Sequence, residues 1–301
     1  MQTTPPQDER LAAAWRDHRQ YVLDVAYRML GSVTEAEDVV QETFARLFRA
    51  EDEIADVRGW LVVVATRLCL DQLRSARAKR EAYVGPWLPE PVVESAGAPV
   101  DPADRITLDD SVRMAMLVVL ERLTPAERAA FVLHEVFRFS FDDVATIVGR
   151  SPEACRQLAS RARRRIQEGT APPRFHVDRA EVARLADRFI EAATNGDLDA
   201  LKDVLDPDVV GWTDSGGVVG APRSPVAGRD NVAPWFLRFM EQFGVRLAAM
   251  AVNGEPGVLV FQEDRLLAVV AFETRDERIT RIHSIANPEK IAYVASMLGA
   301  G

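Results

Sequence analysis

Cysteine is scarce in this chain: its 301 residues include only Cys69 and Cys155. Each occupies an apolar position of an expected helix, which favours a buried core thiol over a disulfide or a metal ligand. We therefore expect no structural metal, and the sequence indicates no cofactor.

Long hydrophobic runs are also lacking. The richest, residues 60–65, is far shorter than the roughly 18 residues that a membrane span requires. Residues 1–10 are polar and acidic, without the apolar core of a signal peptide. We expect a cytoplasmic protein that does not contact a membrane, and the length predicts two or three domains.

Positive charge is in deficit overall but concentrated locally. The net charge of −9 argues, at first sight, against nucleic acid. However, residues 67–80 hold five basic residues against one acid, and residues 150–168 hold six arginines against two glutamates. Because DNA binding depends on local fields, this pattern suits a protein that binds DNA at chosen faces and another protein elsewhere.

The first part of the chain, residues 8–82, predicts a helical domain. Apolar residues at three-to-four spacing predict one buried face that includes Trp15, and Gly31 ends that helix. Residues 34–37 read as a capping box for a second helix, whose Val40, Phe44 and Phe48 share a side. A third helix is expected over residues 57–80, with Asp56 as its cap.

A proline- and glycine-rich linker, residues 83–108, leads to a second helical domain, residues 109–169. Residues 124–127 and 140–143 have the sequence of helix starts.

The last domain, residues 174–298, places helices before strands, which indicates an α+β layer fold. Its expected helices are residues 179–193, 198–205 and a third ending at Phe243, and its expected strands are residues 245–252, 258–262, 266–274 and 279–285, with Asn253-Gly254, Glu263-Asp264 and Asp276-Glu277 as turns.

Within the second domain, Gly149, Ser151 and Pro152 have the turn chemistry of a helix-turn-helix. A solvated amphipathic hairpin is the alternative, and the six arginines favour DNA binding. Side chains near the start of the second helix that can form two hydrogen bonds are suited to base recognition in the major groove. Arginines further along this helix are suited to contacts with phosphate groups. The candidate base-reading residues are Glu153, Arg156, Gln157 and Ser160, and the candidate phosphate contacts include Arg161 and Arg164.

Two further polar faces lie on the first domain. Asp38, Gln41, Glu42 and Ala45 lie opposite the apolar side of the second helix, and a plain solvated face explains them equally well. On the third helix, an aromatic residue leads a stripe that suits stacking on single-stranded DNA, unless that aromatic belongs to the core. The stripe consists of Trp60, Arg67, Asp71 and Arg74.

These residues carry a resemblance to a family. Glu-Asp-Val-Val-Gln-Glu-Thr-Phe (residues 37–44) with Val-Arg-Gly-Trp-Leu (residues 57–61) resembles the second region of extracytoplasmic-function sigma factors. Leu-Thr-Pro-Ala-Glu-Arg (residues 123–128) with the helix-turn-helix resembles their fourth region. The resemblance implies core RNA polymerase, through its β′ clamp and β subunit, and promoter DNA as partners.

The same resemblance assigns roles to the candidate residues. Asp38, Gln41 and Glu42, with Ala45 beside them, would face the β′ clamp, and the second region would melt the −10 element. The loop of residues 50–59 would hold a flipped base. The base-reading residues of the helix-turn-helix would recognise the −35 element.

Two other strings, Arg-Leu-Cys-Leu-Asp (residues 67–71) and Trp-Leu-Pro-Glu-Pro (residues 87–91), resemble the subgroup with a fused SnoaL-like domain, a branch of the NTF2-like cone fold. Its Asp-Gly-Gly-Gly stretch reads here Asp214-Ser215-Gly216-Gly217, and its Asn-Pro-Asp-Lys-Leu stretch reads Asn287-Pro288-Glu289-Lys290-Ile291. The resemblance implies a regulatory role for both stretches.

We therefore predict a sigma factor with two all-α domains followed by an α+β SnoaL-like domain that regulates in cis, by packing on the linker. A stand-alone helix-turn-helix regulator with a ligand-sensing domain is the alternative, and a small-molecule ligand in the cone pocket is expected as a partner in either case. A third reading is an enzyme in which Trp212, Asp214 and His283 line that pocket. A lone histidine on a strand is more often structural, so we expect no enzyme.

Overall fold

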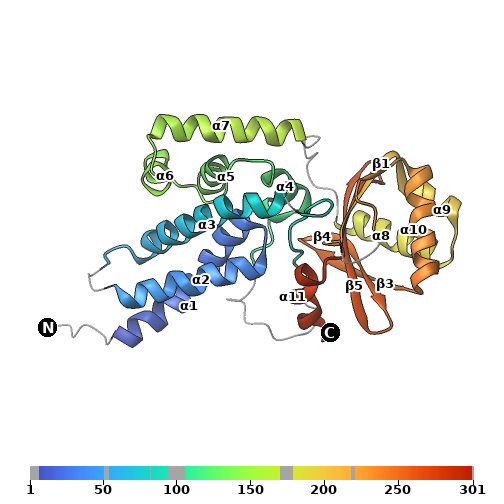
Figure 1. The fold of residues 1–301 in the computed structure, drawn as a ribbon, viewed down its shortest axis with the longest axis horizontal. Helices are drawn as coiled ribbons and strands as arrows, with labels where there is room; N and C mark the ends of the chain where they lie inside the picture. Colours follow the sequence, from blue (N-terminus) through green and yellow to red (C-terminus); the bar gives the residue numbers. More distant parts are fainter. Residues whose placement is uncertain are drawn as a thin grey trace. The chain divides into compact units, whose positions relative to one another are not determined.

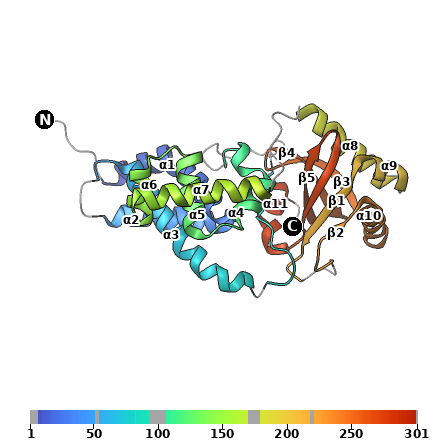
Figure 2. The ribbon, with the colours of Figure 1, turned by 90° about the horizontal axis from the view of Figure 1, so that it is seen from above.

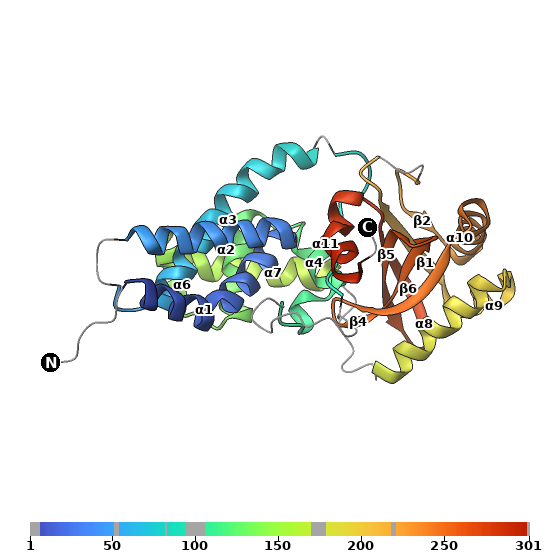
Figure 3. The same cartoon turned by 90° about the horizontal axis from the view of Figure 1, so that it is seen from below.

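The amino-terminal part of the chain consists of α1 (Gln7–Leu30), α2 (Val33–Arg49) and α3 (Val57–Glu81). Figures 1 and 3 show α1 and α2 lying side by side. These elements belong to a computed structural model that describes residues 7–50, 54–81, 83–93, 106–169, 179–217 and 221–299.

A second helical block follows the linker. Its elements are η2 (Asp110–Val112), α4 (Met114–Leu120), α5 (Pro125–Phe131), the π-helical turn η3 (Val132–Val136), α6 (Phe141–Val148) and α7 (Pro152–Gly169). From Val119 onward this block forms one compact unit with α1, α2 and most of α3, and that unit also includes Ile106 and Thr107. The described residues 83–93 and 108–118 belong instead to a second unit, with the carboxyl-terminal domain. The linker expected over residues 83–108 is thus divided between the two units.

Side-chain caps begin most of these helices where the sequence indicates. Thr124 with Glu127, and Ser140 with Asp143, form complete capping boxes, and Asp56 accepts a hydrogen bond from the amide of Gly59 at 2.9 Å. The capping box expected at residues 34–37 is wrong. The cap of α2 is Ser32, two residues earlier, because its hydroxyl accepts a hydrogen bond from the amide of Glu35 at 3.1 Å.

Two aromatic residues expected in the core are partly at the surface. Trp15 is 38% exposed and Phe48 is 49% exposed, although the Trp15 ring still packs edge-on against Phe44 with centroids 4.8 Å apart. They lie near the amino end of α1 and the carboxyl end of α2, where the described chain does not cover them fully.

The second unit is built on a six-stranded sheet in the order β2-β1-β6-β5-β4-β3, with β1 parallel to β6 and every other pair antiparallel. The strands are β1 (Leu205–Asp214), β2 (Val226–Ala227), β3 (Arg246–Val252), β4 (Glu255–Gln262), β5 (Arg265–Arg275) and β6 (Arg278–Ile285). Strands β3 to β6 and their turns confirm the expected meander, whereas β1 was not predicted.

Helices cover both faces of this sheet. Figures 1 and 2 show α8 (Arg179–Thr194), α9 (Leu198–Val204) and α10 (Arg229–Phe243) on one face and α11 (Pro288–Leu298) on the other. The α+β class is therefore confirmed, although α11 was not predicted.

Successive side chains of each strand point to opposite faces of the sheet, so neighbouring residues pack against different helices. Phe272 and Ile282 pair across β5 and β6 and join the apolar cluster under α8 to α10, where Phe189 packs against both Phe236 and Phe272. The next pair, Ala271 and His283, projects to the opposite face. On that face the apolar cover comes from residues 88 and 93 of the linker, Met114 and α11.

Within the described residues, no helix combines the length and the hydropathy needed to cross a membrane.

The position of the α2 cap gives a direct test. Ser32→Ala removes the hydroxyl that satisfies the amide of Glu35, so we expect the free energy of unfolding of the first unit to fall by about 1 kcal/mol in urea titrations. The control is Thr34→Ala, one residue inside the helix, for which we expect less than half that loss. Equal losses in the two variants would contradict the assignment of Ser32 as the cap.

Candidate functional sites

The helix-turn-helix presents the polar face that the sequence predicts. Gly149 ends α6 in the left-handed region (φ 71°). The apolar face of α7 is buried, and it consists of Cys155, Leu158, Ala159, Ala162 and Ile166. Glu153, Arg156, Gln157 and Ser160 on the other face are exposed. Glu153 and Arg156 lie 3.5 Å apart, both largely exposed, so this pair is screened by water and can exchange for DNA groups.

The arginines further along α7 are not equivalent. Arg161 and Arg165 converge on Glu127 at 3.3 and 2.7 Å, and Arg163 lies 3.1 Å from Glu135. Burial raises the pKa of Glu127, but the Thr124 cap and the two arginines outweigh that effect and bring the pKa below its ordinary value. Arg161, a candidate phosphate contact, is thus also part of the packing of α7 on α5.

Arg164 stands apart from that cluster. It is exposed, and its contact with Glu168 is long at 3.9 Å. A side chain in this state is available to a phosphate.

The stripe on α3 is exposed at Arg67, Asp71 and Arg74, and Trp60 is partly buried. Asp71 and Arg74 pair at 3.0 Å. Arg67 donates a hydrogen bond to the carbonyl oxygen of Thr146 on α6 at 3.4 Å. The structure therefore brings Arg67 of this stripe against the helix-turn-helix.

On α2, Asp38 and Gln41 are exposed, and Glu42 and Ala45 are partly exposed. Glu42 pairs with Arg46 at 2.8 Å, one helical turn away. The face is at the surface, and the half-exposed ring of Phe48 lies on the same helix.

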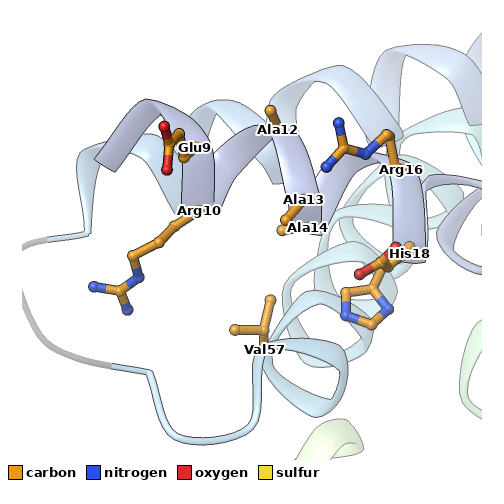
Figure 4. Close-up of a pocket in the computed structure, with 9 residues that line it drawn as sticks. Glu9, Arg10, Ala12, Ala13, Ala14, Arg16, His18 and Val57 are labelled. Carbon is orange, nitrogen blue, oxygen red and sulfur yellow. The ribbon is translucent and has the colours of Figure 1, made fainter. Parts of the chain in front are cut away.

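An open groove lies beside these helices, between the first part of α1 and Val57 at the start of α3 (Figure 4). Arg10, Arg16 and His18 line it with Glu9 and several alanines. It adjoins the loop expected to hold a flipped base, of which residues 51–53 lie outside the described part of the chain.

A buried carboxylate organises the candidate regulatory site of the second unit. Asp214, at the end of β1, has no exposed surface. Its oxygens accept hydrogen bonds from the Tyr83 hydroxyl at 2.5 Å, the Leu88 amide at 2.7 Å and the Lys290 ammonium at 2.6 Å. Burial and the adjoining Asp214 carboxylate raise the pKa of the Tyr83 hydroxyl, which therefore remains a donor.

Lys290 completes this site from α11. Its ammonium also donates to the carbonyl oxygen of Leu88 at 2.6 Å and lies 3.8 Å from the centroid of the Trp87 ring. Such a desolvated cation over an indole is a favourable cation–π contact. Asp214 and Lys290 thus bind both the amide and the carbonyl of one linker residue.

The glycine and asparagine of the two expected regulatory stretches meet each other. Asn287 donates from Nδ2 to the Tyr83 hydroxyl at 2.8 Å and caps α11, with Pro288 at the first turn and the Glu289 amide bonded to Asn287 Oδ1 at 3.0 Å. A Cβ on Gly216 (φ 60°) would lie 2.8 Å from Asn287 Nδ2, so the position requires glycine.

Gly217 has the same requirement. Its φ is 78°, in the left-handed region that favours glycine, and a Cβ there would be in ordinary contact with Val84 of the linker at 3.4 Å.

Asn253 is a functional candidate that the sequence reasoning used only as a turn residue. It is fully buried, and its amide donates to the carbonyl oxygen of Val92 at 2.7 Å. Its side chain accepts from the Val92 amide at 3.2 Å and donates to the Val112 carbonyl oxygen at 2.9 Å. Nothing in the Asn-Gly pattern distinguishes this role from an ordinary hairpin turn.

The residues considered for catalysis do not face the helices that would enclose a cone pocket. Trp212, Asp214 and His283 project from the opposite face of the sheet. His283 Nε2 lies 2.8 Å from Glu273, and its ring stacks on Trp212 with centroids 5.4 Å apart. The expected pocket-lining position of these three residues is therefore wrong, because the register of β1 and β6 points them toward the linker and α11.

Three family models match successive parts of the chain. The family model for sigma-70 region 2 matches residues 14–79, that for sigma-70 region 4 matches residues 113–166, and that for the SnoaL-like domain matches residues 186–282. The probable ECF RNA polymerase sigma factor SigI of Mycobacterium tuberculosis is 44% identical over 299 residues, which cover 98% of this chain and 99% of the relative.

A second relative, the ECF RNA polymerase sigma factor SigJ of the same organism, is 40% identical over 288 residues and covers 90% of each chain. The crystal structure of M. tuberculosis SigJ superposes with a TM-score of 0.76 at 35% identity, covering 93% of this chain and 98% of that one.

The contrast between two arginines of α7 is testable. Because Arg156 is a candidate for a bidentate base contact, we expect Arg156→Ala to cost about 1–3 kcal/mol at one base position of a bound duplex. Arg164→Ala should instead weaken binding to all sequences and lower the salt dependence by about one counterion. Fluorescence anisotropy with single-base variants over a salt series measures both, and exchanged phenotypes would refute the assignment.

Proposed function

Because this chain belongs to the extracytoplasmic-function RNA polymerase sigma factors, we propose that it directs core RNA polymerase to promoters and that its SnoaL-like domain regulates this step in cis. In this proposal the α2 face binds the β′ clamp, α3 contacts the −10 element and α7 reads the −35 element. The fourth-region module also contacts the β subunit.

The observation that carries the regulatory part is the position of the linker. Residues 83–93 lie in one unit with the SnoaL-like domain, and their contacts are made with backbone groups as well as side chains. Backbone binding fixes the path of the linker, and that path determines how the two helical modules can be presented to polymerase.

The Asp214 site is well suited to control whether the linker is bound to the domain or released from it. The linker is bound here by charged groups, because Asp214 accepts from the Leu88 amide and the Tyr83 hydroxyl and Lys290 donates to the Leu88 carbonyl oxygen. Hydrogen bonds to charged groups contribute roughly 1.5–3 kcal/mol each. The second anchor, Asn253, makes neutral hydrogen bonds, each contributing about 1 kcal/mol. Release of the Trp-Leu-Pro-Glu-Pro segment therefore depends mainly on Asp214 and Lys290.

The apolar cluster under α8 to α10 supports regulation by contact rather than by turnover. Phe189, Phe236 and Phe272 pack together there. A small-molecule ligand bound to this domain would act on the site described above by changing the fit of the linker.

Replacement of the buried carboxylate tests the regulatory proposal in the full chain. Asp214→Ala leaves Lys290 buried without its partner, so we expect the Leu88 amide to exchange with deuterium at least a hundredfold faster, measured by mass spectrometry. Run-off transcription with core polymerase should change in the same variant. Asp208→Ala, an exposed position on the same strand, is the control and should change neither quantity.

If Asp214→Ala releases the linker while transcription stays at the native level, the SnoaL-like domain does not regulate through the linker. If the Leu88 amide remains protected, Asp214 is not the anchor.

The polymerase-docking face has its own test. Gln41→Ala combined with Asp38→Ala should reduce co-purification with core polymerase at least tenfold, because both exposed side chains lie at the centre of the proposed contact. A stand-alone regulator would keep its transcriptional effect in this variant. The same double substitution should leave duplex binding by α7 unchanged.

A further inference from the structure

Arg156, a candidate base-reading residue near the start of α7, contacts both a carboxylate and an aromatic ring. Its Nη1 lies 3.5 Å from Glu153 Oε1, and the side chains of this pair are 54% and 73% exposed. Its guanidinium carbon lies over the ring of Phe141, 5.4 Å from the ring centroid. Because water screens an exposed ion pair strongly, the ring is the firmer of these two contacts.

A ring contact is well suited to an arginine that reads a base. The carboxylate of Glu153 competes with a base for the N–H groups of Arg156, whereas a ring attracts the cation without accepting its ordinary hydrogen bonds. These N–H groups can then donate to two acceptors in one plane, as O6 and N7 of a guanine require. Contact with Phe141 is therefore compatible with base recognition.

The ring of Phe141 is itself held in place by a second ring. The imidazole of His134 stacks on it, with centroids 3.8 Å apart and an angle of 26° between the planes. Both side chains are partly buried, and Phe141 also packs against the apolar core of the helix-turn-helix. Phe141 is the first residue of α6, inside the capping box of Ser140 and Asp143, so its backbone is fixed as well.

An uncommon backbone path places His134 against this ring. After the π-helical turn η3, Arg138 adopts a left-handed conformation (φ 62°), and the Phe139 amide donates to the carbonyl oxygen of Leu133 at 3.0 Å. His134 Nδ1 lies 2.8 Å from the Phe139 carbonyl oxygen, which can only accept, so this nitrogen carries the proton. Both π-helical turns and left-handed residues other than glycine are enriched at functional sites.

We propose that Phe141, supported by His134, is a positioning residue that holds the guanidinium of Arg156 for recognition of one guanine by α7. Its consequence for DNA rests on the proposed function, in which α7 reads the −35 element. An arginine that is oriented in advance loses less conformational entropy on binding. The stack of Phe141 and His134 thus sets, through Arg156, how strictly one base pair is distinguished from its alternatives.

Base discrimination by the full chain bound to core RNA polymerase tests this role. Duplexes are first selected from a random library by this complex, and the base pair read by Arg156 is the one at which Arg156→Ala loses discrimination. Phe141→Leu keeps an apolar side chain but removes the ring, so it should reduce discrimination at that base pair about two- to fivefold. It should leave the affinity for a duplex of unrelated sequence unchanged.

Three further variants separate positioning from folding. Phe141→Tyr keeps the ring and should retain native discrimination. In the Arg156→Ala background, Phe141→Leu should cause no further loss at that base pair, because its effect passes through the arginine. Val148→Ala, at a partly buried position of the same helix and the same apolar core, is the matched control and should not change discrimination.

The free full-length chain gives a measurement that needs no DNA. Nuclear magnetic relaxation of the Nε–Hε group should show Arg156 to be more ordered than Arg164, whose contact with Glu168 is long at 3.9 Å. In Phe141→Leu the order parameter of Arg156 should fall to the level of Arg164. His134→Ala should lower it in part, and this variant decides the question if Phe141→Leu does not fold.

Native order at Arg156 in both Phe141→Leu and His134→Ala would overturn the proposal. A loss of discrimination in Phe141→Leu that is spread equally over all positions of the duplex would overturn it too. If Arg156→Ala loses discrimination nowhere while Phe141→Leu still lowers the order of Arg156, the ring positions the arginine and the assignment of Arg156 as a base reader is wrong. A failure of positioning is thus distinguishable from a failure of base reading.

Discussion

The second unit depends on a buried carboxylate that is neutralised by groups from distant parts of the chain. Asp214 ends β1, Lys290 begins α11, and Tyr83 and Leu88 come from the linker. An isolated charge in this position would be strongly unfavourable, so the three segments are stable there together or not at all. The linker is therefore a structural component of the domain that is proposed to regulate it.

The first unit also contains buried charged residues, and there they are arginines paired with acids. Arg28 and Arg128 are buried beside the acids Asp24 and Glu121. Arg28 also donates to the carbonyl oxygen of Thr107, and Arg128 donates to the carbonyl oxygen of Arg28. Each unit thus anchors one end of the linker region to buried charges: Leu88 in the second and Thr107 in the first. Removal of one partner from a buried ion pair costs roughly 3–5 kcal/mol, so each of these anchors depends on both of its charged residues.

The features that were predicted correctly from the sequence depend on interactions between residues close together in the chain. Caps at Thr124 and Ser140, the turn at Gly149 and the alternation of β3 to β6 follow from interactions within a few residues, and the structure has them where expected. Strand β1 was missed because its parallel partner, β6, lies about seventy residues later. In addition, the Asp-Pro-Asp sequence near its start is typical of a loop. The roles of Asn253 and Thr107 were missed for the same reason, since their partners lie 161 and 83 residues away.

The resemblance singled out two stretches with an expected regulatory role, and the geometry supplies a physical reason for their residue types. Gly216 leaves room for Asn287, Asn287 orients Tyr83, and Tyr83 donates to Asp214, so the two stretches act as one site across the linker. Ser215, which departs from the family pattern, lies between these contacts, and its hydroxyl accepts a hydrogen bond from the Gly217 amide at 3.3 Å. The glycine that the family has there is replaced at a position that tolerates a side chain, whereas Gly216 is retained where a side chain would collide. The departure therefore leaves the chemistry of the linker site intact.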